Sequence, residues 1–183
     1  TSFAAALAGY YKKIDVVHVE AGLRTGDLYS PWPEEGNRQL NTIISKYHFA
    51  PTETSKLNLM REGISPKEIF VTGNTVIDAV VQTAAAIKRS EQLSTELITR
   101  FQYIQNFANM LLVTCHRREN HGDGIRNICT GIKNIALKNP KTLIIFPVHK
   151  NPVVQDEVMK KLNDVPNIKL LKPLDYIEFV YLM

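Results

Sequence analysis

The sequence predicts an α/β fold built on open parallel sheets, and three observations support that class. Short apolar runs alternate with helical stretches along the chain. Those runs are apolar on successive residues, which is typical of parallel strands covered on both faces. Helices separate consecutive strands, which indicates right-handed βαβ crossovers. The expected strands are residues 14–19, 47–50, 69–72, 110–115, 143–148 and 167–171.

Four helices are expected between these strands. Three follow from apolar residues at i, i+3, i+4 and i+7 spacing, which predicts one buried face on each helix. The first begins near Pro33, and a further helix begins near Glu53 and ends at Gly63. The expected buried faces are Leu40, Ile43, Ile44 and Tyr47; Ile77, Val80, Val81, Ala84 and Ile87; and Ile125, Ile128, Cys129, Ile132 and Ile135.

The stretch 88–109 interrupts this rhythm, because it is polar and no strand is expected between Thr72 and Met110. We therefore place a domain boundary around residues 74–90 and expect two similar βα domains. The chain lacks an initiator Met, and both ends fall in segments with helical character. We expect it to be the middle portion of a longer protein.

Composition narrows the function classes. The net charge is +4 and basic residues form no runs with interleaved aromatics, which argues against nucleic-acid binding. No apolar run approaches the ~20 residues that cross a bilayer, and no signal peptide is recognisable. Cys115 and Cys129 lack metal-ligand spacing, so we expect buried core thiols in a reducing, cytoplasmic compartment. Nicotinamide, ATP and zinc motifs are absent from the sequence.

The first candidate site residue is Glu20, which directly follows the expected strand 14–19. Ligands of open α/β sheets bind beyond the carboxyl ends of the strands. Gly22 permits a tight turn there, and a carboxylate at that position needs a partner or a ligand. The alternative is an ion pair between Glu20 and Arg24 or another loop cation. Position alone does not decide between these readings.

The second candidate is the segment SPWPEE at residues 30–35, which contains two prolines, the only Trp of the chain and two acidic residues. Acids in a first helical turn complement the helix dipole, which is a purely structural reason for them. A proline-stiffened loop is also suited to holding a reacting carboxylate, which favours a functional role for Glu34. Arg38, one turn later, could pair with Glu34 or reach a phosphate.

The third candidate is TCHRREN at residues 114–120, where His116, Arg117 and Arg118 follow a strand and precede a glycine-bearing turn. Guanidinium groups near a helix N-terminus are suited to binding a diphosphate. His149 follows the next strand in the same way, although it could equally be a solvated loop residue or a helix cap. The remaining histidines are expected to be structural: His18, His48 and His121.

Together these motifs resemble a known family. HVEAGLRTGDLYSPWPEEGNR, FAPTETSKLNLMREG, VTGNTVIDA, HRREN and FPVHKNP, in this order, resemble bacterial UDP-N-acetylglucosamine 2-epimerase of the non-hydrolysing type. The resemblance covers essentially the whole chain. It implies the glycosyltransferase-B fold, with two Rossmann-like domains and a cleft between them. Residues 1–78 would form the second half of the N-terminal domain and residues 79–183 the first half of the C-terminal domain.

The resemblance also implies an activity: reversible epimerisation at C2 of UDP-N-acetylglucosamine to UDP-N-acetylmannosamine, by elimination and re-addition of UDP through 2-acetamidoglucal. Neither cofactor nor metal is expected, and the family implies a homodimer with no nucleic-acid or membrane partner. UDP-N-acetylglucosamine would be the substrate and also an activator at Glu34, Arg117 and His149. The implied catalytic residues are Glu20, Glu34 and His116, and the implied substrate-binding residues are Arg24, Arg117, Arg118 and His149.

Other functions remain open. A hydrolysing relative would release UDP and free N-acetylmannosamine, a glycosyltransferase of the same fold would need an acceptor, and an inactive fragment would only bind the nucleotide sugar. The family has a further catalytic aspartate in a segment that would precede residue 1, and a uridine-binding loop that would follow residue 183. We therefore expect activity only from the full-length protein.

Overall fold

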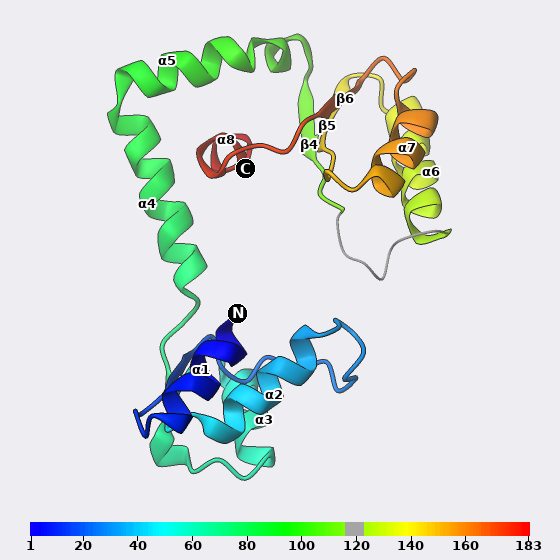
Figure 1. The fold of residues 1–183 in the computed structure, drawn as a ribbon. Helices are drawn as coiled ribbons and strands as arrows, with labels where there is room; N and C mark the ends of the chain where they lie inside the picture. Colours follow the sequence, from blue (N-terminus) through cyan, green and yellow to red (C-terminus); the bar gives the residue numbers. More distant parts are fainter. Residues whose placement is uncertain (116–122) are drawn as a thin grey trace. The chain divides into compact units, whose positions relative to one another are not determined.

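The computed structural model describes residues 1–115 and 123–183, which form two compact units, Thr1–Ala79 and Val80–Met183 (Figure 1). Each unit contains a three-stranded parallel sheet, with strand orders β1-β2-β3 and β4-β5-β6. The expected α/β class with parallel strands is therefore confirmed. The assignment of residues 1–78 and 79–183 to halves of two larger domains stays a prediction.

The first unit alternates helices and short strands. Its elements are α1 (Ser2–Tyr11), β1 (Val17–Val19), α2 (Glu34–Ile44), β2 (Tyr47–Ala50), α3 (Glu53–Arg61), η1 (Pro66–Glu68) and β3 (Ile69–Val71). Strand β2 lies in the centre, with Val17 opposite Tyr47 and His48 opposite Ile69. Thr52 caps α3 by accepting a hydrogen bond from the Ser55 amide, and Gly63 follows the helix with a φ of 90°.

Two expectations for this unit are wrong. Leu40 and Ile43, predicted to be buried, are 44% and 76% exposed, and Tyr47 belongs to β2. Helix α2 instead buries a polar face, because Asn41 donates a hydrogen bond to Ser2 of α1 and Thr42 accepts one from Arg24. The strands are also not covered on both faces, since Val17, Val19, Phe70 and Val71 are exposed in this three-stranded sheet.

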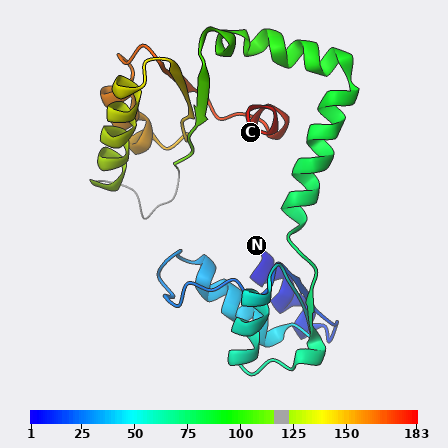
Figure 2. The same cartoon turned by 180° about the vertical axis from the view of Figure 1, so that it is seen from behind.

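The second unit also alternates helices and strands. Its elements are α4 (Thr75–Arg89), which begins in the first unit, α5 (Glu91–Arg100), η2 (Gln102–Asn106), β4 (Asn109–Leu112), α6 (Asp123–Lys138), β5 (Thr142–Pro147), α7 (Pro152–Leu162), β6 (Ile168–Leu171) and α8 (Tyr176–Leu182). All six strands lie at the expected places with small shifts at their ends. In both views of the chain, α6 and α7 lie side by side on one face of the second sheet (Figure 2).

The central strand β5 is covered on both faces, as expected for a parallel sheet. Ile144 and Phe146 pack into one apolar cluster with α6 and α7, while Leu143 and Ile145 pack into a second cluster with α5 and α8. Cys115 and Cys129 are buried as expected, and burial raises the pKa of the Cys129 thiol to about 11. On α4 and α6 the predicted faces are buried only in part, since Ile77, Val81 and Ile135 are exposed.

No helix within residues 1–115 and 123–183 combines the length and apolar character that a membrane crossing requires.

Candidate active site

The site begins at the carboxyl end of β1, where Glu20 follows the last strand residue. Its φ is 65°, a left-handed conformation that is uncommon for a side chain of this kind. Asn74 Nδ2 donates a hydrogen bond to Glu20 Oε1 at 3.2 Å. Backbone outliers of this type concentrate at functional sites, so the conformation of Glu20 independently favours a functional role.

The loop after Glu20 is fixed against α3. Ala21 is fully buried and its amide donates a hydrogen bond to the Phe49 carbonyl at 2.9 Å. Gly22 has a φ of 84°, and a Cβ there would lie 2.2 Å from the Ser55 carbonyl oxygen. Asn58 Nδ2 donates a hydrogen bond to the Gly22 carbonyl at 3.0 Å. The helix therefore holds this loop by contacts that only glycine permits.

Arg24 does not pair with Glu20, so the alternative that named Arg24 as the ion-pair partner is wrong. Its guanidinium binds Glu62 in a bidentate pair, with Nε–Oε1 and Nη2–Oε2 distances of 2.6 and 2.8 Å. Arg24 Nη1 and Nη2 also donate to the Leu23 carbonyl and to Thr42 Oγ1, at 2.8 and 2.7 Å. The side chain is 8% exposed and fastens the loop to α2 and α3. Its expected role in substrate binding stays a prediction.

The SPWPEE segment leads into α2. Both of its X–Pro bonds are cis, and Pro33 is the N-cap residue, so Glu34 and Glu35 occupy the first helical turn as expected. The two acids point to different surroundings. Glu35 is fully buried, whereas Glu34 lines a cavity. Sequence reasoning did not distinguish them in this way, because adjacent acids at a helix start look equivalent in a sequence.

Glu35 has a structural explanation. Burial alone raises its pKa, but hydrogen bonds from Gln39 and from the Thr25 and Gly26 amides, together with the nearby Arg24 charge, bring the pKa below its ordinary value. Arg38 Nη1 lies 3.7 Å from Glu35 Oε2, so Arg38 pairs with Glu35 and not with Glu34. Glu35 therefore anchors the loop to α2 as a buried carboxylate.

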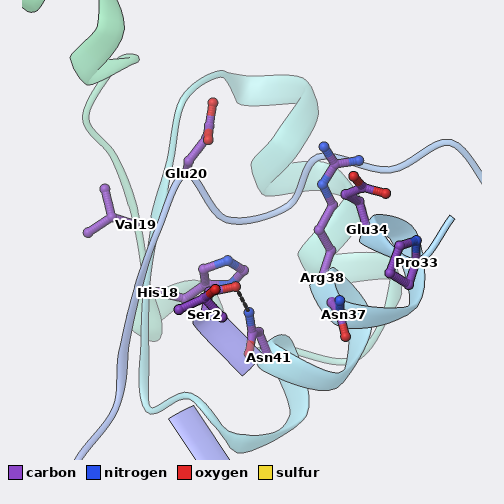
Figure 3. A pocket seen from close by; sticks show the side chains of 10 residues that line it. Ser2, His18, Val19, Glu20, Pro33, Glu34, Asn37, Arg38 and Asn41 are labelled. Carbon is purple, nitrogen blue, oxygen red and sulfur yellow. Dashed lines mark hydrogen bonds between the residues drawn. The ribbon is translucent and has the colours of Figure 1, made fainter. Parts of the chain in front are cut away.

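The feature that connects these elements is a cavity of about 440 Å³, here called the carboxylate cavity. Glu20 reaches it from the loop after β1, while Glu34 and Arg38 reach it from α2 (Figure 3). A volume of this size lies in the ordinary range for small-molecule sites. Its lining residues are Thr1, Ser2, His18, Val19, Glu20, Pro33, Glu34, Asn37, Arg38 and Asn41.

His18 is the cavity residue that sequence reasoning missed. It lies on β1 opposite His48 of β2, and burial lowers its pKa to about 4, with smaller contributions from His48, Arg24 and Arg38. At neutral pH the ring is therefore uncharged. The one available signal in the sequence was its position two residues before Glu20, on the strand that leads to it.

The other nominated residues lie elsewhere in the chain. His149 is exposed in the second unit, and its Nδ1 accepts a hydrogen bond from the Asn151 amide at 3.2 Å. Asn151 caps α7, so His149 contributes to the cap structure that was the structural alternative for it. His116, Arg117 and Arg118 lie outside the residues that the structure describes. Within residues 1–115 and 123–183, no group of three His, Cys, Asp or Glu side chains could hold a metal ion.

Parallel α/β units and two carboxylates at one cavity define an α/β protein with a candidate small-molecule site. Comparison with known proteins identifies the family: its model, described as UDP-N-acetylglucosamine 2-epimerase, matches residues 1–183, and the chain belongs to this family. A Yersinia pestis protein of that name is 50% identical over the whole chain. The chain covers 49% of that relative, so it spans about half its length.

Solved structures agree with this assignment. The UDP-N-acetylglucosamine 2-epimerase of Neisseria meningitidis bound to UDP-N-acetylglucosamine has a TM-score of 0.93 and 47% identity, covering 98% of this chain and 48% of that chain. A trehalose 6-phosphate synthase from Burkholderia multivorans has a TM-score of 0.52 at 12% identity, covering 98% and 45%, which shows the fold alone. The expected glycosyltransferase-B type fold, partly present in this chain, is confirmed.

Proposed function

We propose that this chain is the middle portion of an enzyme that interconverts UDP-N-acetylglucosamine and UDP-N-acetylmannosamine. The observation that supports this most strongly is the convergence of Glu20 and Glu34 on one cavity from separate elements. The family supplies the substrate class, since the related Neisseria meningitidis enzyme was solved with UDP-N-acetylglucosamine bound. The whole protein's activity is a proposal, because the chain spans only half of such relatives.

The chemistry explains why two carboxylates are needed. The C2 proton of the sugar is not next to a carbonyl and is barely acidic. Cleavage of the C1–oxygen bond, with UDP leaving, gives C1 oxocarbenium character and makes that proton acidic. Its loss yields 2-acetamidoglucal, and return of a proton to the opposite face of C2 with return of UDP to C1 completes the inversion. Acid/base groups on both faces of C2 are therefore required.

Glu20 and Glu34 are proposed for this acid/base work. Their carboxylates also stabilise positive charge at C1 in the transition state. Arg38, beside Glu34 in the cavity, supplies the guanidinium that a departing diphosphate requires. His116, Arg117, Arg118 and His149 of the second unit are proposed to bind the diphosphate. Arg24, which fastens the loop after Glu20, is proposed to bind the substrate as well.

The partner proposals follow from the family resemblance. We propose that a second UDP-N-acetylglucosamine molecule activates the enzyme through Glu34, Arg117 and His149, and that the full-length protein is a homodimer. Activation predicts a sigmoidal dependence of rate on UDP-N-acetylglucosamine, whereas a hyperbolic dependence would contradict it. Sedimentation of the full-length protein decides the oligomeric state.

The test is to incubate the full-length protein with UDP-N-acetylglucosamine and follow the products by NMR. The proposal predicts an equilibrium mixture of the two UDP-sugars, reached from either side. Accumulation of free N-acetylmannosamine and UDP would support the hydrolysing alternative. Conversion only when an acceptor is added would support a glycosyltransferase, and the absence of any conversion would support a binding protein.

A further inference from the structure

His18 has an unusual combination of surroundings for a residue expected to be structural. It lines the carboxylate cavity together with Glu20, Glu34 and Asn41 (Figure 3). Its Nδ1 is buried without a hydrogen-bond partner among the described residues. Buried polar atoms normally find a partner, and an exception calls for an explanation such as an absent ligand or water.

Neither of the two polar side chains near His18, those of His48 and Asn41, provides that partner. His48, opposite it on β2, lies with its ring centroid 6.5 Å from that of His18 in an edge-on arrangement. His48 is 1% exposed, and its ring nitrogens make no hydrogen bond to His18. Asn41, the polar neighbour from α2, uses its Nδ2 on Ser2 and leaves its Oδ1 unpartnered.

The charge state of the ring follows from this setting. Burial lowers the pKa of both histidines, and the second ring and the cations Arg24 and Arg38 lower that of His18 further. A cationic His18 would attract Glu20 and Glu34 and make both weaker bases. A neutral ring leaves the carboxylates basic and still offers one N–H donor and one acceptor nitrogen.

We propose that His18 is a substrate-contacting residue whose neutral ring hydrogen-bonds the acetamido group on C2 of the sugar. This inference rests on the proposed function, in which Glu20 and Glu34 act on C2. The acetamido group is attached to that same carbon, and His18 lines the same cavity as the two carboxylates. Because Nδ1 is buried, we assign this hydrogen bond to the other ring nitrogen, Nε2, which a neutral imidazole can use either as a donor or as an acceptor.

The test measures binding of three ligands to the full-length protein by calorimetry: UDP-N-acetylglucosamine, UDP-glucose, which has a hydroxyl at C2, and UDP. His18→Leu removes the donor and acceptor, and His18→Gln restores one of each. Loss of one hydrogen bond predicts that His18→Leu binds UDP-N-acetylglucosamine about 3- to 10-fold more weakly. Its affinities for UDP-glucose and UDP stay unchanged, and His18→Gln recovers most of the loss.

Two results would overturn the inference: equal weakening of all three ligands, which marks a structural role, or unchanged affinity in His18→Leu. Thermal unfolding scans of His18→Leu and His18→Gln confirm that both variants are folded. The outcome is separable from the proposed function. A wild-type protein that binds UDP-N-acetylglucosamine selectively but never epimerises it would contradict the proposed function. It would not contradict the hydrogen bond between His18 and the acetamido group.

Discussion

The two units of the chain bury different kinds of side chain. In the second, β5 lies between two apolar clusters, and Ile144, Ile145 and Phe146 are fully buried. In the first, the apolar cluster contains only Ala21, Ala50, Leu59 and Ile69, and several buried residues are polar. The difference indicates that the second unit is stabilised mainly by packing. The first unit holds the loop after Glu20 with hydrogen bonds and ion pairs.

Helices α2 and α6 show the same contrast on a smaller scale. Both carry apolar residues at helical spacing, and α6 buries that face with Ile125 and Ile132. In α2 the polar face is buried instead, because Thr42 contacts Arg24 and Glu35 accepts hydrogen bonds from Gln39 and the adjoining loop. Periodicity therefore finds a helix but does not identify its buried face when polar side chains have partners.

The largest expected effect is on the packed unit. Phe146→Ala removes a fully buried side chain from β5, and we expect a loss of about 3–5 kcal/mol in the free energy of unfolding. Ile135→Ala on α6 is the control, because Ile135 is 46% exposed and its removal should change stability by less than about 1 kcal/mol. Urea unfolding followed by circular dichroism measures both. Equal effects would show that the second unit is not stabilised by packing.

The next effect concerns the proposed catalytic residues of both units. Glu20→Gln and Glu34→Gln should each lower turnover of the full-length protein by about 100-fold or more, because each removes a positioned acid/base group. His116→Ala should do the same. The control is Glu53→Gln, since the Glu53 side chain is 73% exposed on α3. Initial rates of epimerisation are measured for all four variants. If a variant of Glu20, Glu34 or His116 has the wild-type rate, that residue has no part in catalysis.

Sequence reasoning succeeded where a local signal was sufficient. All six strands were predicted because each is a compact apolar run. The ends of α3 were predicted near Glu53 and at Gly63, and glycine is favoured just after a helix. Glu20 and Glu34 were nominated from a strand end and a proline-stiffened turn, and both line the cavity.

The rest depended on contacts between distant residues. The partner of Arg24 is Glu62, which lies on another part of the chain, and no local sequence pattern identifies it as the partner. The distinction between Glu34 and Glu35 depends on which side of α2 faces the loop at Thr25 and Gly26. His18 became a candidate only when the fold placed it at one cavity with Glu34 and Asn41 of α2.

A smaller effect tests how the loop is held. Gly22→Ala should cost about 1–3 kcal/mol, because its Cβ would collide with the Ser55 carbonyl and its φ is positive. Gly63→Ala is the matched control, since Gly63 has a φ of 90° with open space around it, and we expect about 1 kcal/mol there. Thermal unfolding compares them. A smaller loss at Gly22 than at Gly63 would contradict the close contact with α3.

The smallest effect is a pH dependence. Because the folded pKa of His18 is about 4, below its ordinary 6.5, the unfolded chain binds this proton first as pH falls. The stabilising contribution is present above pH 6.5 and is lost between pH 6.5 and 4, by about 1 kcal/mol for a partly exposed ring. Fluorescence of Trp32, the only Trp, reports unfolding of this unit. His18→Gln should flatten the slope, and an unchanged slope would contradict the assignment.

The most direct test of the carboxylate cavity as a C2 acid/base site is the reaction of the full-length protein in heavy water. The account predicts deuterium at C2 of both recovered UDP-sugars, with incorporation slowed about 100-fold or more in Glu20→Gln and Glu34→Gln. Epimerised sugar that retains its original C2 hydrogen, or free sugar and UDP as the only products, would contradict it.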